Sequence, residues 1–320
     1  MQTSDFLALI EEGLRALPLP AVPEGLYSPI AYALDGGGKR MRPMLTLLAH
    51  NLYSDDAEAA LPIALAFEVY HNHTLLHDDL MDRADVRHGR PSVWRKWDEN
   101  TAILSGDAML IESYRLALNF QGPRRDDILS LFARTTREIC EGQQYDMNFE
   151  KRTDVEMSEY MEMIRLKTSV LPAGALKAGA LAADAPATDA DRLYRVGEKM
   201  GLAFQLQDDL LDCYGDPATF GKRIGGDILC GKKTYLSLLA LQKADVATKA
   251  RLLELLAAGQ EEAIAPVLEI YGALNVEHET HDAIEALYAE ASAELAAVAC
   301  PDERKQVLAD YLTAILRRNK

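Results

Sequence analysis

Two five-residue segments carry three aspartates each, DDLMD at residues 78–82 and DDLLD at residues 208–212. In each segment the first and last aspartates are four residues apart, so on a helix their carboxylates share one face. Like charges so placed repel unless a cation lies between them, and carboxylate oxygens suit Mg²⁺. A solvated acidic helix end is the alternative for either segment alone. Two copies, each ending a long apolar stretch, favour a metal site with the candidate ligands Asp78, Asp79, Asp82, Asp208, Asp209 and Asp212.

A third segment, GGGKRMRP at residues 36–43, places three glycines before Lys39, Arg40 and Arg42. Backbone N–H groups and cationic side chains of this kind can bind a phosphate together. The segment lacks the rest of the nucleotide P-loop pattern, so it does not indicate an ordinary nucleotide site. A glycine-rich loop that opens a basic helix is the alternative. Further basic groups near the aspartates are Arg83, Arg87, His88, Arg90, Lys167, Lys222, Lys232 and Lys233.

The bulk composition narrows the class of protein. A net charge of −16 over 320 residues argues against a general nucleic-acid binder, because phosphate backbones need a basic face. The four cysteines match no zinc spacing. The acidic N-terminal stretch lacks the basic start of a signal peptide, and no apolar run approaches the roughly 18 residues of a membrane span. We expect a cytoplasmic protein without a transmembrane segment.

Helical periodicity predominates between the glycine and proline breaks. Apolar residues recur at three- and four-residue steps over residues 61–81, 102–118, 128–145 and 193–211, and the Ala/Leu/Glu-rich stretches 284–298 and 307–316 also favour helix. No stretch shows the sustained alternation of a β-strand. We therefore predict one all-α domain over residues 1–320, a bundle of a dozen or more helices. The stretch 61–81 is apolar around most of its circumference and should be central.

The order and spacing of five motifs resemble the polyprenyl synthetase family of trans-isoprenyl diphosphate synthases. They are GGGKRMRP, DDLMD followed by ADVRHGRPS, LKTS, FQLQDDLLD and GKRIGGDILCGKKTY, and together they run from about Gly36 to Tyr235. The resemblance implies an isoprenoid synthase fold, in which the helices surround a central cavity. It also implies a transferase that joins isopentenyl diphosphate head-to-tail to an allylic diphosphate (dimethylallyl, geranyl or farnesyl).

The same resemblance implies a role for each matching residue. Isopentenyl diphosphate would bind Gly38, Lys39, Arg42, His71 and, at a position where the family usually has a second arginine, His88. The allylic diphosphate would bind Arg87, Lys167, Thr168, Gln205, Lys222 and Lys232. Two or three Mg²⁺ ions would lie between the two aspartate segments. The residues closest to the chemistry would be Asp78, Asp82, Asp208, Lys167, Thr168 and Gln205.

Two departures from the family pattern concern the isopentenyl diphosphate site. His88 stands where the family usually has arginine, and a neutral imidazole binds phosphate less well than a bidentate guanidinium. The pattern then continues with Ser92 and Trp94 where the family usually has P-T-x-H. Neither change removes a metal ligand.

The resemblance also leads to expectations about product, assembly and alternatives. His73, five residues before the first aspartate segment, and Tyr70 would limit the growing chain beyond the small Thr74, which predicts a geranylgeranyl product with farnesyl second. A homodimer is expected, with residues 102–118 at its interface. A terpene cyclase and a non-catalytic regulatory subunit remain alternatives, although all six aspartates and the basic loop are present.

Overall fold

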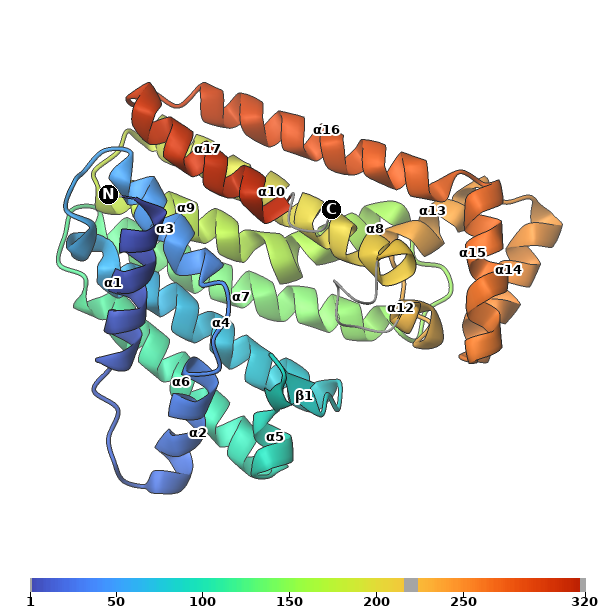
Figure 1. Cartoon of the computed structure of the whole chain (residues 1–320), viewed down its shortest axis with the longest axis horizontal. Helices are drawn as coiled ribbons and strands as arrows, with labels where there is room; N and C mark the ends of the chain where they lie inside the picture. Colours follow the sequence, from blue (N-terminus) through green and yellow to red (C-terminus); the bar gives the residue numbers. More distant parts are fainter. Residues whose placement is uncertain (1, 216–223, 317–320) are drawn as a thin grey trace. The chain divides into compact units, whose positions relative to one another are not determined.

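The computed structural model describes residues 2–215 and 224–316, and almost all of their regular structure is helical (Figure 1). The α-helices are α1 (Thr3–Arg15), α2 (Glu24–Leu34), α3 (Met41–Asn51), α4 (Leu61–Met81), α5 (Val93–Lys96), α6 (Glu99–Asn119), α7 (Arg125–Phe149), α8 (Met157–Ile164), α9 (Val170–Ala182), α10 (Ala187–Tyr214), α12 (Gly226–Leu229), α13 (Tyr235–Lys243), α14 (Val246–Ala258), α15 (Ile264–Ala273), α16 (Val276–Ala296) and α17 (Asp302–Leu316). Short 3₁₀ helices η1 (Ala57–Ala60) and η3 (Glu261–Ala263) and a π-helix, η2 (Arg165–Ser169), complete the helical structure.

The predicted all-α class and helices are confirmed, and most helices extend beyond the apolar pattern. α4 has the predicted bounds, whereas α6 begins three residues before the predicted 102–118. The added turn is polar and is capped by Asp98, whose carboxylate accepts a hydrogen bond from the backbone N–H of Thr101. Polar capping residues therefore extend the helix where periodicity gives no signal.

One small departure from the helical prediction follows the first aspartate segment. Strands β1 (Val86–Arg87) and β2 (Arg90–Pro91) form an antiparallel pair in which Arg87 lies opposite Arg90. His88 and Gly89 connect them with φ values of 50° and 74°. Two consecutive positive φ values are the signature of a type I′ hairpin turn, which glycine adopts without strain. The strands are too short for an alternating pattern to reveal them.

The chain forms two compact units, each assembled from separate stretches of sequence. Unit 1 contains residues 1–136, 174–194 and 298–308, and unit 2 contains residues 137–173, 195–297 and 309–320. α10 contributes its first turns to unit 1 and the remainder to unit 2. The single domain over residues 1–320 stays a prediction.

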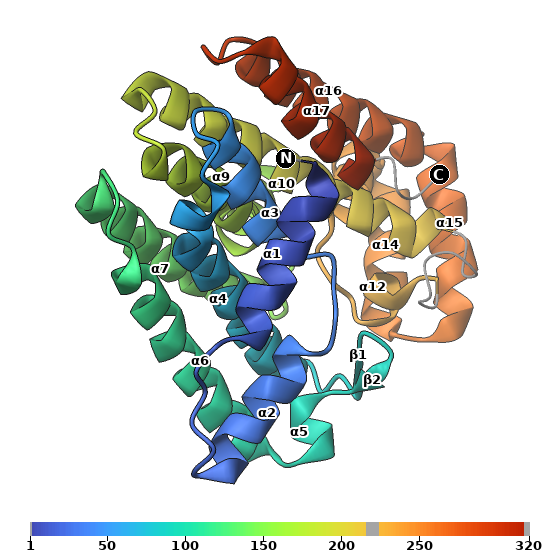
Figure 2. The same ribbon diagram turned by 60° about the vertical axis from the view of Figure 1, so that its left-hand side comes forward.

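In unit 1, α4 is the central helix, as its apolar circumference predicted. Every residue from Ile63 to Tyr70 is buried, including Glu68. α4 packs along α6 and also against α3, and Figures 1 and 2 both show these helices side by side. The Phe132 ring contacts Phe67 and Tyr70 edge-to-face inside the unit. The first aspartate segment thus lies at the end of a helix whose preceding turns are buried in the core of unit 1.

In unit 2, a separate core surrounds the second half of α10. Leu206 and Leu210 of this helix pack with Tyr160 of α8 and with Val267 and Tyr271 of α15. The second aspartate segment belongs to the same turns of α10. No helix in the two described stretches is long and apolar enough to cross a bilayer. The cytoplasmic location stays a prediction.

Candidate active site

The first aspartate segment forms the last turn of α4, and its three carboxylates have different surroundings. Asp79 is only 3% exposed, and its Oδ1 accepts hydrogen bonds from Nε (2.9 Å) and Nη2 of Arg87. Burial raises the pKa of Asp79, and the hydrogen bonds from Arg87 oppose that rise. Asp82 is exposed and Asp78 half-buried. The middle carboxylate therefore positions the β-hairpin, and the outer two lie nearer to solvent.

The second aspartate segment, on α10, shares part of this division, because its middle and last aspartates, Asp209 and Asp212, are both buried. Asp209 is 4% exposed and accepts hydrogen bonds from the Tyr160 hydroxyl, from Gln205 Nε2 (3.1 Å) and from the backbone N–H of Tyr235 (2.9 Å). Burial raises the pKa of Asp209 to about 7, although these hydrogen bonds lower it. Asp208 is half-buried. In both segments the middle aspartate is thus held by the protein and the first is more accessible.

Asp212 is linked to the start of α12. Its Oδ2 accepts a hydrogen bond from the backbone N–H of Asp227 at 3.0 Å, and its carbonyl accepts one from Gly225 at 2.7 Å. These bonds fix the far side of the loop that follows the second segment. Lys222, a predicted diphosphate ligand, lies outside the described residues, and Lys232 is exposed just beyond α12.

The carboxylates fit Mg²⁺ by their chemistry. Mg²⁺ is usually bound through one or two carboxylates, with substrate phosphates and waters as its other ligands. Asp78 in the last turn of α4 and Asp82 directly after that helix offer such a pair, and Asp208 with Asp212 offers another on α10. Within the described stretches, no three acidic, histidine or cysteine side chains form a metal cage by themselves.

Lys167 and Thr168 lie on the π-helix η2, between α8 and α9. π-helical turns contain one extra residue and are frequent at functional sites. Lys167 Nζ lies 2.5 Å from Asp146 Oδ2, and Thr168 Oγ1 donates to Gln205 Oε1 at 3.1 Å. Gln205 in turn donates to Asp209, so three predicted site residues form one hydrogen-bonded chain beside the second segment.

A glycine of α7 makes room for this irregular turn. A Cβ on Gly142 would lie 2.3 Å from the backbone nitrogen of Lys167. Real Cβ atoms do not approach a backbone this closely, so only glycine allows α7 to pass here. Asp146, one turn further along α7, then reaches Lys167. The close approach of α7 to η2 thus positions the ion pair between Asp146 and Lys167.

The residues predicted for isopentenyl diphosphate gather in unit 1. Burial, together with the positive charges of Arg42 and Arg87, lowers the pKa of His71 well below its usual value, so its ring is neutral. Lys39 is exposed and Arg42 half-buried at the start of α3. A Cβ on Gly38 would lie 3.6 Å from the His88 ring, which places the hairpin turn next to the glycine loop.

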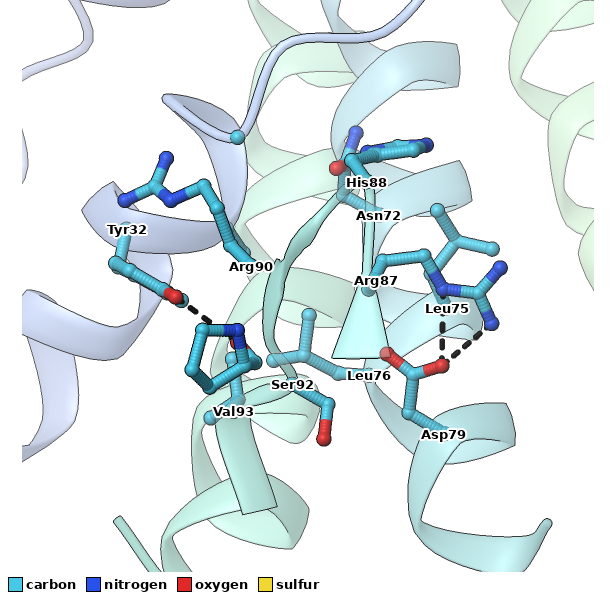
Figure 3. A pocket seen from close by; sticks show the side chains of 13 residues that line it. Tyr32, Asn72, Leu75, Leu76, Asp79, Arg87, His88, Arg90, Ser92 and Val93 are labelled. Atoms are coloured by element: carbon cyan, nitrogen blue, oxygen red, sulfur yellow. Dashed lines mark hydrogen bonds and ion pairs between the residues drawn. The ribbon is translucent and has the colours of Figure 1, made fainter. Parts of the chain in front are cut away.

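A small pocket of about 30 Å³ lies between the hairpin, α2 and α4. Figure 3 shows Arg87 bonded to Asp79 on one side of the pocket and Tyr32 and Arg90 on the other, with His88 at the top of the view. Burial and the charge of Arg87 lower the pKa of His88. A neutral His88 can still donate one hydrogen bond, but it does not supply the charge of the usual arginine.

The residues expected to limit chain length lie inside unit 1. His73 Nδ1 lies 3.0 Å from the carbonyl oxygen of Gly106 on α6, and the Tyr70 hydroxyl donates to the carbonyl of Thr136 at 3.0 Å. The Tyr70 ring also contacts His73 and Phe132. His73 is therefore engaged with a neighbouring helix, and Tyr70 is part of an aromatic cluster.

Sequence reasoning missed several residues that support the site. Asp146 pairs with Lys167, Tyr160 with Asp209, and Glu68 with Arg40. Asp146 is one of 50 acidic residues, and no local pattern distinguishes it from the others. Glu68 did leave a signal, because it is the one carboxylate within the apolar stretch of residues 63–70. A buried acid in such a stretch requires a partner.

Comparison with known proteins shows the family to which the chain belongs. A geranylgeranyl diphosphate synthase of Methanosarcina mazei is 39% identical over 223 residues, which cover 69% of this chain and 69% of that protein. A geranylfarnesyl diphosphate synthase of Natronomonas pharaonis is 39% identical over 236 residues, covering 68% and 69% respectively. A crystal structure of a geranylgeranyl pyrophosphate synthase matches with a TM-score of 0.94 at 40% identity, and the match covers 100% of both chains. Residues 23–274 match the family model described as polyprenyl synthetase. The chain belongs to the polyprenyl synthetase family and has the all-α fold of isoprenyl diphosphate synthases.

Proposed function

We propose that the protein is a short-chain trans-prenyl diphosphate synthase, which joins isopentenyl diphosphate head-to-tail to an allylic diphosphate. Membership of the polyprenyl synthetase family makes it a prenyltransferase. The observation that carries the specific proposal is the repeated aspartate arrangement. In each segment a buried middle carboxylate is held by protein donors, and the first carboxylate is more accessible. The alternative of a regulatory subunit would not need two such intact segments.

Mg²⁺ is the proposed cofactor, with two or three ions per active site. Asp78, Asp82, Asp208 and Asp212 would hold it, while Asp79 and Asp209, the remaining predicted ligands, would act mainly by anchoring the segments. When bound, the metal neutralises the diphosphate leaving group and stabilises its departure. The proposal that both segments serve one diphosphate rests on family membership.

The basic residues complete the proposed binding of the allylic substrate. Lys167 would bind its diphosphate, and Asp146 would hold the ammonium group in place. Arg87, fixed by Asp79, is a further proposed ligand of the allylic diphosphate, an assignment that rests on family membership. Lys222 and Lys232 would add charge. Preorganised positive charge of this kind stabilises the leaving group without reorganisation during the reaction.

Thr168 and Gln205 are the proposed neighbours of the allylic carbocation. Thr168 donates to Gln205 Oε1, so the hydroxyl oxygen can face the developing positive charge. The double bond of isopentenyl diphosphate attacks this cation, and the proton that is then lost passes to the departing diphosphate. Gly38, Lys39, Arg42, His71 and His88 would hold the diphosphate of isopentenyl diphosphate.

We also propose a homodimer and a geranylgeranyl product, with farnesyl diphosphate as the second candidate. α6 exposes Ile103, Leu104, Ile111 and Leu118, an apolar face that a second copy would cover. Tyr70, with its ring against Phe132, would end the space available to the growing chain.

The decisive assay uses the purified protein with Mg²⁺, isopentenyl diphosphate and each allylic diphosphate in turn. Diphosphate release and a longer prenyl product identified by mass spectrometry would support the proposal. Asp78→Ala and Asp208→Ala should each lower turnover by several orders of magnitude. No product with any allylic substrate, or near-normal turnover in either variant, would contradict the proposed function.

A further inference from the structure

Arg40 lies between two proposed ligands of isopentenyl diphosphate, but its side chain has a different environment. Lys39 is exposed and Arg42 half-buried, whereas the Arg40 side chain is only 2% exposed. Arg40 adopts the left-handed conformation at the N-terminus of α3, with φ 47° and ψ 38°. Non-glycine residues rarely adopt this conformation, and it is retained where surrounding contacts enforce it. For Arg40, the hydrogen bonds of its guanidinium hold the backbone in this conformation.

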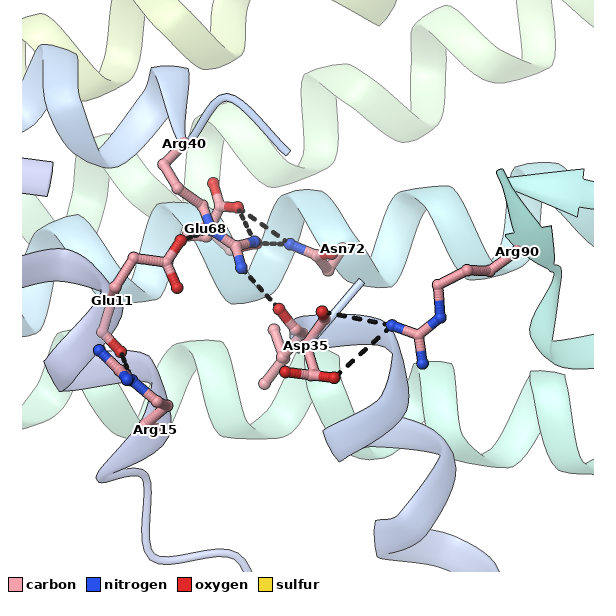
Figure 4. Close-up of polar contacts among 8 residues, drawn as sticks. Glu11, Arg15, Asp35, Arg40, Glu68, Asn72 and Arg90 are labelled. Atoms are coloured by element: carbon pink, nitrogen blue, oxygen red, sulfur yellow. Dashed lines mark hydrogen bonds and ion pairs between the residues drawn. The ribbon is translucent and has the colours of Figure 1, made fainter. Parts of the chain in front are cut away.

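The Arg40 guanidinium donates in three directions, as Figure 4 shows. Nε donates to Glu11 Oε1 of α1 at 2.8 Å, and Nη1 donates to Glu68 Oε1 of α4 at 2.9 Å. Nη2 donates to the carbonyl of Leu34, the last residue of α2, at 2.6 Å. One side chain therefore joins the start of α3 to three other helices.

Glu68 connects this contact to the part of α4 that carries site residues. It lies three residues before His71, and Asn72 Nδ2 donates to its carbonyl at 2.9 Å and to its Oε1 at 3.3 Å. Glu68 and Arg40 are both within electrostatic range of His88. The Arg40–Glu68 pair thus lies between the glycine loop and the turn of α4 that holds His71.

Stability alone does not account for a pair buried in this way. Removing two charges from water costs about as much as their attraction returns, and apolar residues of similar volume often serve as well. Apolar side chains would not fix the orientation of the neighbouring helices, whereas the planar guanidinium forms hydrogen bonds to its partners along defined directions. The pair therefore has a geometric role.

We propose that Arg40 is a positioning residue for isopentenyl diphosphate, which fixes the glycine loop against Glu68 so that Lys39, Arg42 and His71 converge on one diphosphate. The inference rests on the proposed function and deepens it. Arg40 itself does not touch the substrate. Its loss should weaken isopentenyl diphosphate binding selectively, because Lys167 and the second aspartate segment are held by contacts of their own.

The test uses Arg40→Lys in the full-length protein, because lysine keeps the charge but loses the three-way fork. Calorimetry in EDTA would measure the Kd for isopentenyl diphosphate without metal or turnover. Kinetics in Mg²⁺ would give kcat and both KM values. We expect the Kd and KM for isopentenyl diphosphate to rise about tenfold, while kcat and the allylic KM change less than about threefold. Glu68→Gln keeps the volume and should raise the same two constants by a smaller factor.

Arg304→Lys is the matched control. Arg304 also forms a fork, to the carbonyl of Asn51 at the other end of α3 and to Asp55. Its replacement should leave the Kd unchanged. The inference is overturned if Arg40→Lys leaves the Kd unaltered, if all kinetic constants worsen together, or if Arg304→Lys has the same effect. If Arg40→Lys does not fold, Glu68→Gln decides by the same criteria.

The proposed function can fail separately. A wild-type protein that binds isopentenyl diphosphate but forms no product would refute the proposed function, and the Kd comparison would still decide the role of Arg40. A wild-type protein that does not bind isopentenyl diphosphate in EDTA would overturn the inference.

Discussion

The aspartates within each segment have two different roles, and the surroundings of each carboxylate determine which role it has. Asp79 and Asp209 are buried and accept hydrogen bonds from the protein, while Asp78 and Asp208 are half-buried at the same ends of their helices. A carboxylate that already accepts several hydrogen bonds is a structural element, because replacing it leaves buried donors unsatisfied. An accessible one can exchange water for a cation.

The two roles predict opposite effects of matched amide substitutions. Asp209→Asn replaces one of the two acceptor oxygens with an NH2 group, which then faces either Gln205 or the Tyr160 and Tyr235 donors. It should lower the free energy of unfolding by about 1–3 kcal/mol. Asp208→Asn should leave that free energy nearly unchanged and lower turnover. Denaturant unfolding without metal and steady-state assays measure the two effects. A stable Asp209→Asn protein would refute the anchoring role.

The two proposed diphosphate sites should also separate in kinetics. Arg42→Gln should chiefly raise the KM for isopentenyl diphosphate, and Lys167→Gln that for the allylic substrate, each about tenfold or more, since each removes one charge-assisted contact. His88→Arg restores a bidentate cation beside Gly38 and should lower the KM for isopentenyl diphosphate. Initial rates with one substrate varied at a time give these constants. A reversed pattern would contradict the assignment of the two sites.

At the scale of helices and hairpins, the sequence predicts what depends on periodicity and misses what depends on one residue. The bounds of α4 follow from its apolar pattern because the helix is buried all round. The π-helix at Lys167 spans only five residues, too few for a period of its own to be recognised. The His88–Gly89 turn joins strands of only two residues. Neither feature produces a repeating signal.

The candidate site shows the same limit. The aspartates and the basic loop were predictable because their spacing is local and their chemistry specific. The pairs Lys167–Asp146 and Arg40–Glu68 join residues more than twenty positions apart, so only the packing of helices brings them together. His73 is a further case, because its distance from the first aspartate segment gives no indication that its ring faces Gly106 of α6.

The contact between α4 and α6 should depend on pH through His73. Burial, and then the neighbouring His77, lower the pKa of His73 to about 4, from 6.5 in the unfolded chain. The folded state therefore binds fewer protons than the unfolded state between these values. The free energy of unfolding is therefore highest above pH 6.5 and falls as pH is lowered towards 4. By pH 5 it has fallen by roughly 1–2 kcal/mol.

His73→Gln removes this titration, so its free energy of unfolding should fall less than that of the wild type between pH 7 and pH 5. Denaturant unfolding at several pH values measures the difference. Identical slopes for wild type and His73→Gln would contradict the lowered pKa.

For the whole molecule, the exposed apolar face of α6 is the feature that a monomer leaves unexplained. Ile111 is 70% exposed, and Leu104 and Leu118 are exposed on the same helix. We predict that Ile111→Glu converts a dimer into a monomer, since an unpaired charge in an apolar interface is costly. Sedimentation equilibrium measures the mass. Val246→Glu, at an exposed valine on α14, should remain dimeric, and a monomeric wild type would refute the interface.

Product length depends on how far the growing chain can extend inside the protein. One α-helical turn rises about 5.4 Å, so Tyr70, two turns before Asp78, is well placed to end a short tunnel. Its ring packs against Phe132, and its hydroxyl is bonded to the carbonyl of Thr136, so the ring cannot swing aside without losing both contacts. His73 instead faces Gly106. Tyr70→Ala should therefore lengthen the products beyond twenty carbons, and His73→Ala should do so less.

Tyr70→Phe is the matched control, because it removes the hydrogen bond to Thr136 and keeps the ring. Its products should keep the wild-type length, although the protein should lose about 1 kcal/mol of stability. Mass spectrometry of dephosphorylated products measures the length distribution for all three variants. Longer products from Tyr70→Phe would assign the limit to the hydrogen bond. An unchanged distribution from both Tyr70→Ala and His73→Ala would exclude this face of α4 as the ruler, because removing either ring opens space that a longer chain would fill.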